Sequence, residues 1–108
     1  MPFSFLGKTL SGCFTVPSGI VTTAPSIIQR VIRDMPEIGV ITTKSIGLEP
    51  RLGNREPVYS QFAPGCFVNA VGLTNPGAQG SLESLGQLCV PDDRFLLVSI
   101  FGGSVEEF

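Results

Sequence analysis

The stretch that decides the fold is PSIIQRVIRDMPEIGVITTKS, residues 25–45. Its first half predicts a helix over Pro25–Arg33, because its apolar residues recur at helical spacing. Pro25 suits the first turn of this helix, and Thr23 is placed to cap it. Its second half, residues 39–45, is rich in β-branched residues and almost continuously apolar up to Thr42. This pattern predicts a strand that is buried on both faces.

Further elements flank this stretch on both sides. Residues 13–17, CFTVP, predict a first strand that ends at Ser18-Gly19. Leucines at a spacing of three predict a short helix over residues 78–88, and residues 95–101, FLLVSIF, predict a third buried strand. Apolar strands that alternate with amphipathic helices are typical of parallel βαβ units. The sequence therefore predicts an α/β fold with a parallel sheet.

Residues 46–75 interrupt this alternation. They contain no long helical period, and loops beyond about 12–15 residues in compact domains are usually functional or disordered. Two short alternating runs, residues 58–62 and 66–71, lie among Gly, Pro and charged residues. We expect them to form a small β-hairpin after the second strand.

Composition excludes several classes of protein. The chain has 108 residues, of which 43% are hydrophobic and 15% charged, which fits one folded unit or part of one. Its net charge is −2 and its seven Lys and Arg are scattered, so we expect no nucleic-acid partner. No apolar run approaches the roughly 20 residues that span a bilayer, so we expect a cytoplasmic protein without a membrane segment. Cys13, Cys66 and Cys89 form no CxxC pair, so we expect reduced thiols and no metal site.

The ends of the predicted strands are where chemistry is expected, because loops converge there in parallel α/β folds. These ends are residues 17–19, 43–45 and 99–103. Lys44 is the most informative residue, because a lysine at the end of a buried strand loses solvation unless an anion or a polar ligand compensates it. Two alternatives remain open: Lys44 pairs with a carboxylate such as Glu49, or its ammonium simply extends into solvent.

Two long motifs then match a known family. TKSIGLEPRLGN (residues 43–54) and NAVGLTNPG (residues 69–77), with PSG at residues 17–19 and VSIFG at residues 98–102, closely resemble the amino-terminal third of class 1 dihydroorotate dehydrogenases. The resemblance covers nearly the whole chain. It implies the first three β/α units of a (β/α)8 TIM barrel, with the hairpin inserted after strand 2, over residues 1–108. It also implies an FMN-dependent enzyme that oxidises dihydroorotate to orotate in pyrimidine biosynthesis.

The resemblance also implies roles for individual residues. Lys44 would be catalytic and would contact both the flavin and the substrate. The flavin would be bound by Ser18, Gly19, Lys44, Ser45 and Ser99, although many members of the family have Asn where this chain has Ser99. The substrate would be bound by Lys44, Asn69, Val71, Gly72 and Leu73.

The loop NAVGLTNPG has a physical rationale in this interpretation. Backbone N–H groups that must approach a flat ligand closely favour a glycine at the point of approach, here Gly72, and Pro76-Gly77 would fix the exit of the loop. The alternative is a turn whose Asn side chains bond to its own backbone. Ser18 likewise either contacts the flavin or satisfies its own turn. Cys66 does not match the catalytic cysteine of some members, which lies in a later loop, so we interpret it as structural.

Length sets the limit of this interpretation. A (β/α)8 barrel needs about 250 residues and eight strands, and this sequence predicts three strands. We therefore expect an incomplete barrel, inactive alone, that needs the missing remainder of the barrel. The family implies a homodimer, and the NPG ending makes an iron–sulfur electron-transfer subunit a candidate partner. Two other hypotheses remain: a non-catalytic structural subunit or remnant within a larger redox assembly, and a related flavin barrel that acts on another pyrimidine.

Overall fold

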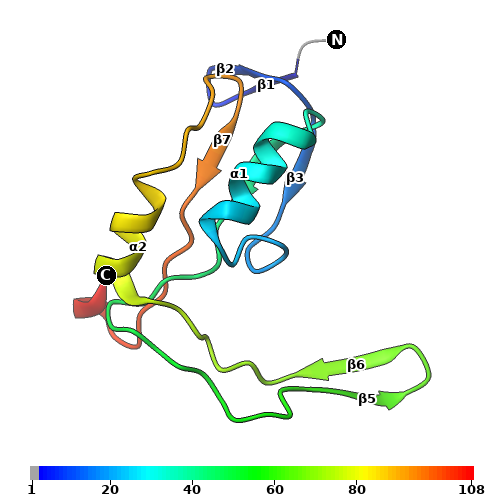
Figure 1. Cartoon of the computed structure of the whole chain (residues 1–108), viewed down its shortest axis with the longest axis vertical. Coiled ribbons are helices and arrows are strands. Elements are labelled where there is room, and N and C mark those ends of the chain that lie inside the picture. Colours follow the sequence, from blue (N-terminus) through cyan, green and yellow to red (C-terminus); the bar gives the residue numbers. More distant parts are fainter. Residues whose placement is uncertain (1–2) are drawn as a thin grey trace.

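A three-stranded parallel sheet forms the centre of the computed structural model, which describes residues 3–108 (Figure 1). The sheet has the order β3-β4-β7, and its strands are Phe14–Val16, Ile38–Thr42 and Phe95–Leu97. Both pairs of neighbouring strands are parallel. Helix α1 (Pro25–Asp34) connects β3 to β4, and helix α2 (Gly77–Leu85) precedes β7. The prediction of an α/β fold with a parallel sheet is confirmed.

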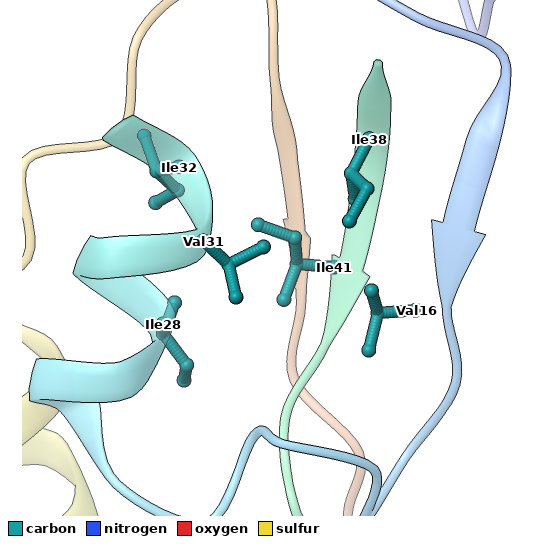
Figure 2. Packing of buried hydrophobic residues seen from close by; sticks show 6 residues of the cluster. All are labelled: Val16, Ile28, Val31, Ile32, Ile38 and Ile41. Atoms are coloured by element: carbon teal, nitrogen blue, oxygen red, sulfur yellow. The ribbon is translucent and has the colours of Figure 1, made fainter. Parts of the chain in front are cut away.

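Helix α1 covers one face of the sheet. Three of its side chains are buried, and Figure 2 shows them directed at the strands; they are Ile28, Val31 and Ile32. They pack against Val16 of β3 and against Ile38 and Ile41 of β4. Each fully buried side chain of this size contributes about 1.5–3 kcal/mol. The expected cap is wrong: Ala24 is the N-cap residue, and no side chain caps the helix.

Strand β4 is the most buried strand, as predicted for residues with a continuous apolar pattern. Its residues Ile38 to Ile41 are all buried, because β4 has a neighbouring strand on each side. Ile41 pairs with Val16 and Leu96, and this row packs with α1.

A short hairpin that the sequence analysis missed precedes the sheet. It pairs β1 (Phe3–Phe5) with β2 (Lys8–Leu10) and lies across the amino-terminal ends of β3 and β7 (Figure 1). Its turn uses Leu6 and Gly7, which have φ values of 48° and 79°. The ring of Phe5 meets that of Phe95 edge-on at 5.6 Å between centroids. The hairpin therefore covers the starting end of β7.

Strand β7 corrects the prediction of a third buried strand over residues 95–101. It ends at Leu97, and Leu97 and Ile100 are 38% and 58% exposed. The physical reason is its place at the edge of the described sheet, where only β4 pairs with it. After Leu97 the chain runs beside the segment that follows β4. A single parallel β-bridge, between Ile46 and Ile100, joins the two segments.

The long segment between β4 and α2 contains an antiparallel hairpin. Strand β5 (Tyr59–Ala63) pairs with β6 (Cys66–Asn69), and the hairpin extends away from the sheet on the side to which β3 and β7 point (Figure 1). Apart from Ala63, the residues of both strands are exposed. A 3-10 helix, η1 (Val105–Glu107), ends the described chain.

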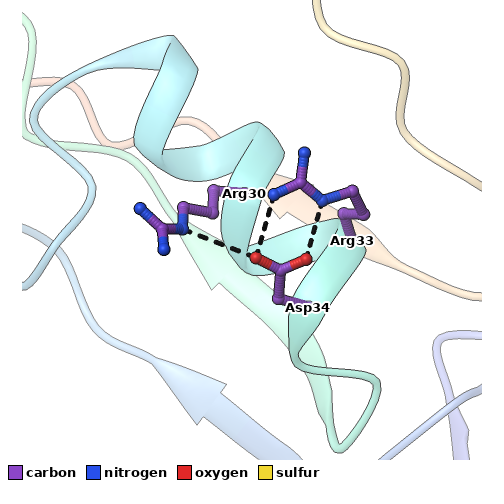
Figure 3. Close-up of polar contacts among 3 residues, drawn as sticks. All are labelled: Arg30, Arg33 and Asp34. Carbon is purple, nitrogen blue, oxygen red and sulfur yellow. Dashed lines mark hydrogen bonds and ion pairs between the residues drawn. The ribbon is translucent and has the colours of Figure 1, made fainter.

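A small ion cluster closes helix α1 (Figure 3). Both Arg30 and Arg33 contact the carboxylate of Asp34, at 3.5 and 2.7 Å. The hydrogen bond from Arg33 lowers the pKa of Asp34 below its ordinary value, and the same contact raises the pKa of Arg33. All three side chains are solvent-exposed, so the cluster contributes little to stability.

The cysteines and helices add two facts about the described residues. Cys13, Cys66 and Cys89 are exposed and have free thiols. Within residues 3–108, no helix has both the length and the apolar character needed to cross a membrane.

Candidate functional site

Three serines meet where the parallel strands end. Ser18 follows β3, Ser45 follows β4, and Ser99 follows β7. The Ser18 and Ser45 hydroxyl oxygens are 3.1 Å apart, and those of Ser45 and Ser99 are 2.8 Å apart. Both distances are those of hydrogen bonds. Three predicted flavin-site residues therefore lie together in one connected row, which we call the hydroxyl row.

Buried threonines fix the backbone around the hydroxyl row. Thr43 is 2% exposed, and its hydroxyl oxygen accepts a hydrogen bond of 3.1 Å from the Ser99 N–H. Thr22 is also 2% exposed, and its hydroxyl accepts from the Gly19 N–H at 3.2 Å. The Lys44 N–H donates to the Thr22 carbonyl at 3.1 Å. These bonds join the loop after β3 to the end of β4, and the end of β4 to that of β7.

Lys44 lies beside this row. A Cβ placed on Gly19 would be 3.9 Å from the Lys44 ammonium nitrogen, so the Lys44 side chain lies over the face of Gly19 from which a side chain would project. Lys44 is half-buried. The ion pairs of the described chain all involve arginine, so the alternative in which Lys44 pairs with Glu49 is not seen in residues 3–108. The ammonium is thus available to an anionic or polar ligand.

The loop between Gly19 and Thr22 is strained. Gly19 has a φ of 82°, which suits glycine, but Val21 has a φ of 48°. A β-branched residue in this region is an outlier that costs of order 1–3 kcal/mol. Such strain occurs most often at binding and catalytic sites.

Asn75, in the loop NAVGLTNPG, has a structural role. Its side-chain oxygen accepts hydrogen bonds from the N–H groups of Gly47 and Gly77, at 3.1 and 2.9 Å. Its side-chain nitrogen donates to the Leu73 carbonyl at 2.8 Å. Its backbone also pairs with Arg51 in both directions. Asn75 therefore ties the loop to the segment that follows β4, and its bonds to Leu73 and Gly77 are of the kind that the turn alternative predicts.

Gly72 has a packing role that the sequence analysis did not identify. Its φ is 84°, and a Cβ at this position would lie 2.8 Å from both the backbone nitrogen and the side-chain Cγ of Asn54. Asn54 also bonds across to the loop, from its N–H to the Val71 carbonyl and from its side chain to the Ala70 carbonyl, at 2.9 and 2.8 Å. The close approach of Asn54 is thus sufficient to require glycine at position 72.

The remaining predicted substrate residues lie near the base of the β5–β6 hairpin. Asn69 ends β6, pairs with Tyr59, and is exposed. Val71 is half-buried, and Leu73 is exposed with a φ of 57°. Among residues 3–108, no side-chain hydrogen bond links Asn69 to Lys44 or to the hydroxyl row. In the described chain Asn69 is therefore not bonded to the residues at the strand ends, and we call Asn69, Val71, Gly72 and Leu73 the hairpin group.

Two cavities adjoin both motifs. The first has a volume of about 270 Å³ and lies between the start of α1, the end of β4 and helix α2. Thr43 and Lys44 line it from the first motif, and Thr74 and Asn75 from the second. A second cavity, of about 420 Å³, is lined by Leu73 together with Gly47 and Phe101. The two motifs are therefore neighbours, through the carboxyl-terminal half of the loop rather than through Asn69.

Sequence reasoning missed the residues that position the site. Thr22, Thr43, Asn54 and Asn75 hold the loops, yet only Thr43 stands next to a predicted flavin or substrate residue. The doublet Thr42-Thr43 was the available signal, because a second polar residue directly before Lys44 implies a partner near the strand end. Within residues 3–108, no cluster of His, Cys, Asp and Glu has the arrangement of a metal site.

Comparisons with known proteins agree with these motifs. A family model described as dihydroorotate dehydrogenase matches residues 2–108. The chain is similar to proteins named dihydroorotate dehydrogenase B (NAD(+)), catalytic subunit, from several archaea. It is 39% identical to that of Pyrococcus abyssi over 94 residues, 37% to that of Pyrococcus furiosus over 102, and 33% to that of Methanosarcina mazei over 106.

Each match covers most of this chain but only part of the relative. The matches include 84%, 94% and 98% of this chain but 29%, 32% and 33% of the three relatives. The chain thus spans about a third of the length of the curated relatives that it matches. Because the family model covers nearly every residue and the strand-end motifs lie within it, this chain belongs to the dihydroorotate dehydrogenase family.

Proposed function

We propose that this chain is the amino-terminal part of an FMN-dependent dihydroorotate dehydrogenase that converts dihydroorotate to orotate in pyrimidine biosynthesis. In this proposal β3, β4 and β7 are the first three strands of a (β/α)8 barrel, and the β5–β6 hairpin is an insertion after the second. The observation that carries it is the position of Lys44, which lies without an ion pair among residues 3–108 and next to the hydroxyl row.

The donor set at the strand ends fits a flavin. It offers the Lys44 ammonium and the hydroxyls of the hydroxyl row, of which Ser18 is exposed, while Lys44, Ser45 and Ser99 are half-buried. When bound, FMN supplies a ring that accepts a hydride and gains negative charge on its pyrimidine edge. Lys44 would stabilise that charge where it develops, since a fixed cation in a site that excludes water acts without reorganisation. Ser18, Gly19, Ser45 and Ser99 would hold the ring.

Residues of the hairpin group would bind the substrate. The Asn69 amide can both donate and accept, which matches the alternating carbonyl and N–H groups of a pyrimidine ring. It is exposed and ends β6, a strand that lies on the side of the sheet to which the parallel strands point (Figure 1). Val71, Gly72 and Leu73 would supply a small apolar wall and backbone groups. Lys44 would contact the substrate from the other side.

The unpaired edges of the parallel sheet indicate which partners this chain needs. Strands β3 and β7 each have one neighbour in the described sheet, so the remaining strands of a barrel would pair with them. The relatives are named catalytic subunits, which suggests a second subunit. We propose an iron–sulfur electron-transfer subunit in that role, and a homodimer of the completed barrel.

A hybrid protein tests this proposal. It joins this chain to the part of the Pyrococcus furiosus relative that follows the matched region. We expect the purified hybrid to be yellow, with absorbance near ~450 nm, and its flavin to be bleached by dihydroorotate without oxygen. Lys44→Ala should slow that bleaching, whereas Lys8→Ala, which removes a lysine that lies over the Phe95 ring, should not. A yellow hybrid in which Lys44→Ala bleaches at the unchanged rate would remove Lys44 from the mechanism.

A second candidate is a non-catalytic structural subunit of a redox assembly. The observation that favours it is the separation of Asn69 from Lys44 in the described hydrogen bonds, since an unused site need not keep its two halves together. A colourless hybrid that is folded would support this candidate. Bleaching by another dihydropyrimidine, and not by dihydroorotate, would instead show a related flavin barrel with a different substrate.

A further inference from the structure

The hydroxyl row has a property that its three members lack individually. Ser18, Ser45 and Ser99 carry three hydroxyl hydrogens, and the row contains two hydrogen bonds. Each bond uses one hydroxyl hydrogen, so one hydroxyl hydrogen always has no acceptor within the row. We call it the spare hydrogen. Among residues 3–108, no other hydrogen bond is made by these three hydroxyl oxygens.

The position of the spare hydrogen is not fixed. If both bonds point toward Ser99, the spare hydrogen is on Ser99; if both point toward Ser18, it is on Ser18. If Ser18 and Ser99 both donate to Ser45, it is on Ser45. Because a serine hydroxyl rotates about its C–O bond, the three arrangements can interconvert. Either partner can be the donor in both bonds, which is consistent with all three.

Burial gives the row an open end and an anchored end. Ser18 is exposed, whereas Ser45 and Ser99 are half-buried. The Ser99 backbone is fixed by the bond from its N–H to the buried Thr43 hydroxyl. A ligand at the strand ends therefore meets Ser18 first, with Ser45 and Ser99 behind it.

We propose that Ser18, Ser45 and Ser99 act as one hydrogen-bonding unit that offers its single spare hydrogen to a ligand through Ser18. The identity of the ligand as the flavin rests on the proposed function. The unit can donate through Ser18 to a ligand acceptor. After both bonds reverse, Ser18 can accept from a ligand donor, and the spare hydrogen moves to Ser99. Ser99 is then a positioning residue, which acts on the ligand through Ser45.

This arrangement suits a ligand whose edge changes from acceptor to donor when it is reduced. A single buried hydroxyl that switched roles would lose its other partner. In the row each switch leaves both bonds intact, and neighbouring bonds strengthen one another. The cost of switching is therefore low.

A double-mutant cycle on the two ends tests the proposal, because their hydroxyls bond to Ser45 and not to each other. We measure the FMN dissociation constant of the hybrid by fluorescence quenching, for Ser18→Ala, Ser99→Ala and both together. Ser18→Ala should weaken binding about three- to tenfold, the loss of one hydrogen bond to the ligand. Ser99→Ala should weaken it by a smaller factor, because Ser99 only strengthens the Ser18 contact through Ser45. The double variant should bind like Ser18→Ala, because Ser99 has no effect once the Ser18 hydroxyl is absent. Effects that multiply would mean independent contacts and would overturn the proposal.

Two further variants separate the row from general packing. Ser45→Ala interrupts the row and should match Ser99→Ala, whereas Ser45→Thr keeps a hydroxyl and should restore wild-type binding. Ser4→Ala, an exposed serine of β1, is the control and should change nothing. Full binding by Ser45→Ala would also overturn the proposal.

The same cycle in the unfolding of the 108-residue chain separates this proposal from the proposed function. One outcome is that the shifts of the urea midpoint caused by Ser18→Ala and Ser99→Ala are not additive, while the wild-type hybrid binds no FMN. This outcome would reject the flavin function and would support the row as a unit. Binding of FMN with additive effects in both measurements would reject the unit and keep the function.

Discussion

Replacing Asn75 with Ala should destabilise the chain far more than the same replacement at Asn69. Both asparagines belong to the loop NAVGLTNPG, six residues apart, but only Asn75 is buried, at 8% exposure. Its side chain makes three hydrogen bonds, and the two that it accepts, from the N–H groups of Gly47 and Gly77, are buried. Alanine would leave both N–H groups without an acceptor.

The magnitude follows from those two donors. A buried donor that loses its partner costs about 1–3 kcal/mol, so two of them cost about 2–6 kcal/mol. The Leu73 carbonyl, which loses the third bond, is part of an exposed residue and can be hydrated. A loss of this size is a large share of the roughly 5–15 kcal/mol that stabilises a typical domain. Asn69→Ala should change stability by less than about 0.5 kcal/mol, as is usual for exposed sites.

Urea unfolding followed by circular dichroism measures the global effect, and amide hydrogen exchange measures the local one. We expect a lower urea midpoint for Asn75→Ala and faster exchange at Gly47 and Gly77. Asn75→Asp keeps an acceptor for both N–H groups and loses only the donor to Leu73, so it should be intermediate. Equal midpoints for Asn75→Ala and Asn69→Ala, with unchanged exchange at both glycines, would refute the reasoning.

Two other outcomes are expected. Gly72→Ala should cost at least about 1 kcal/mol more than Gly65→Ala in urea unfolding, because both have positive φ but only Gly72 would clash, with Asn54; similar costs would show that Asn54 gives way. For Asp34, whose pKa is lowered in the folded state by Arg33, the ion pair stabilises above the unfolded pKa of about 4 and is lost as pH falls through the lower folded value. The difference in melting temperature between wild type and Asp34→Asn should thus be small at pH 7, smaller still in high salt, and absent in strong acid; a difference that grows in acid would contradict this sign.

Elements with a strong, unambiguous period were predictable from the sequence. The prediction for α1 was correct to within one residue at its end, because its buried side chains lie on one face of the helix. Strand β4 was located correctly, because a continuous β-branched run between two breaks has few other solutions, but it ends at Thr42 and not at residue 45 as predicted. Parallel pairing followed from the alternation of these two patterns.

Short elements and strand ends were not predictable. The β1–β2 hairpin has three residues per strand and a Leu6-Gly7 turn, and neither is a strong signal. The apolar residues after Leu97 predicted a continued strand. An apolar sequence does not show, however, that the pairing between β4 and β7 ends at Leu97. Whether a neighbour exists is a property of the sheet, not of the segment.

The residues of the candidate site were predictable from the sequence, but the contacts between them were not. Ser18, Ser45 and Ser99 were selected individually, and their row of hydrogen bonds requires the register of three strands. Gly72 was selected because a ligand was expected to approach it closely. Its contact with Asn54 instead depends on how the two ends of the segment 46–75 pack against each other. Long-range pairing of this kind leaves no periodic trace in a sequence.

The strand order β3-β4-β7 has a consequence for how the chain assembles during synthesis. Residues 17–37 separate β3 from β4, while residues 43–94 separate β4 from β7, and the longer closure costs about 0.6–1 kcal/mol more in chain entropy. The β3-α1-β4 unit also leaves the ribosome first. We therefore expect this unit to dock early and β7 to pair later with the exposed edge of β4, so that Ser99 is the last hydroxyl to take its place.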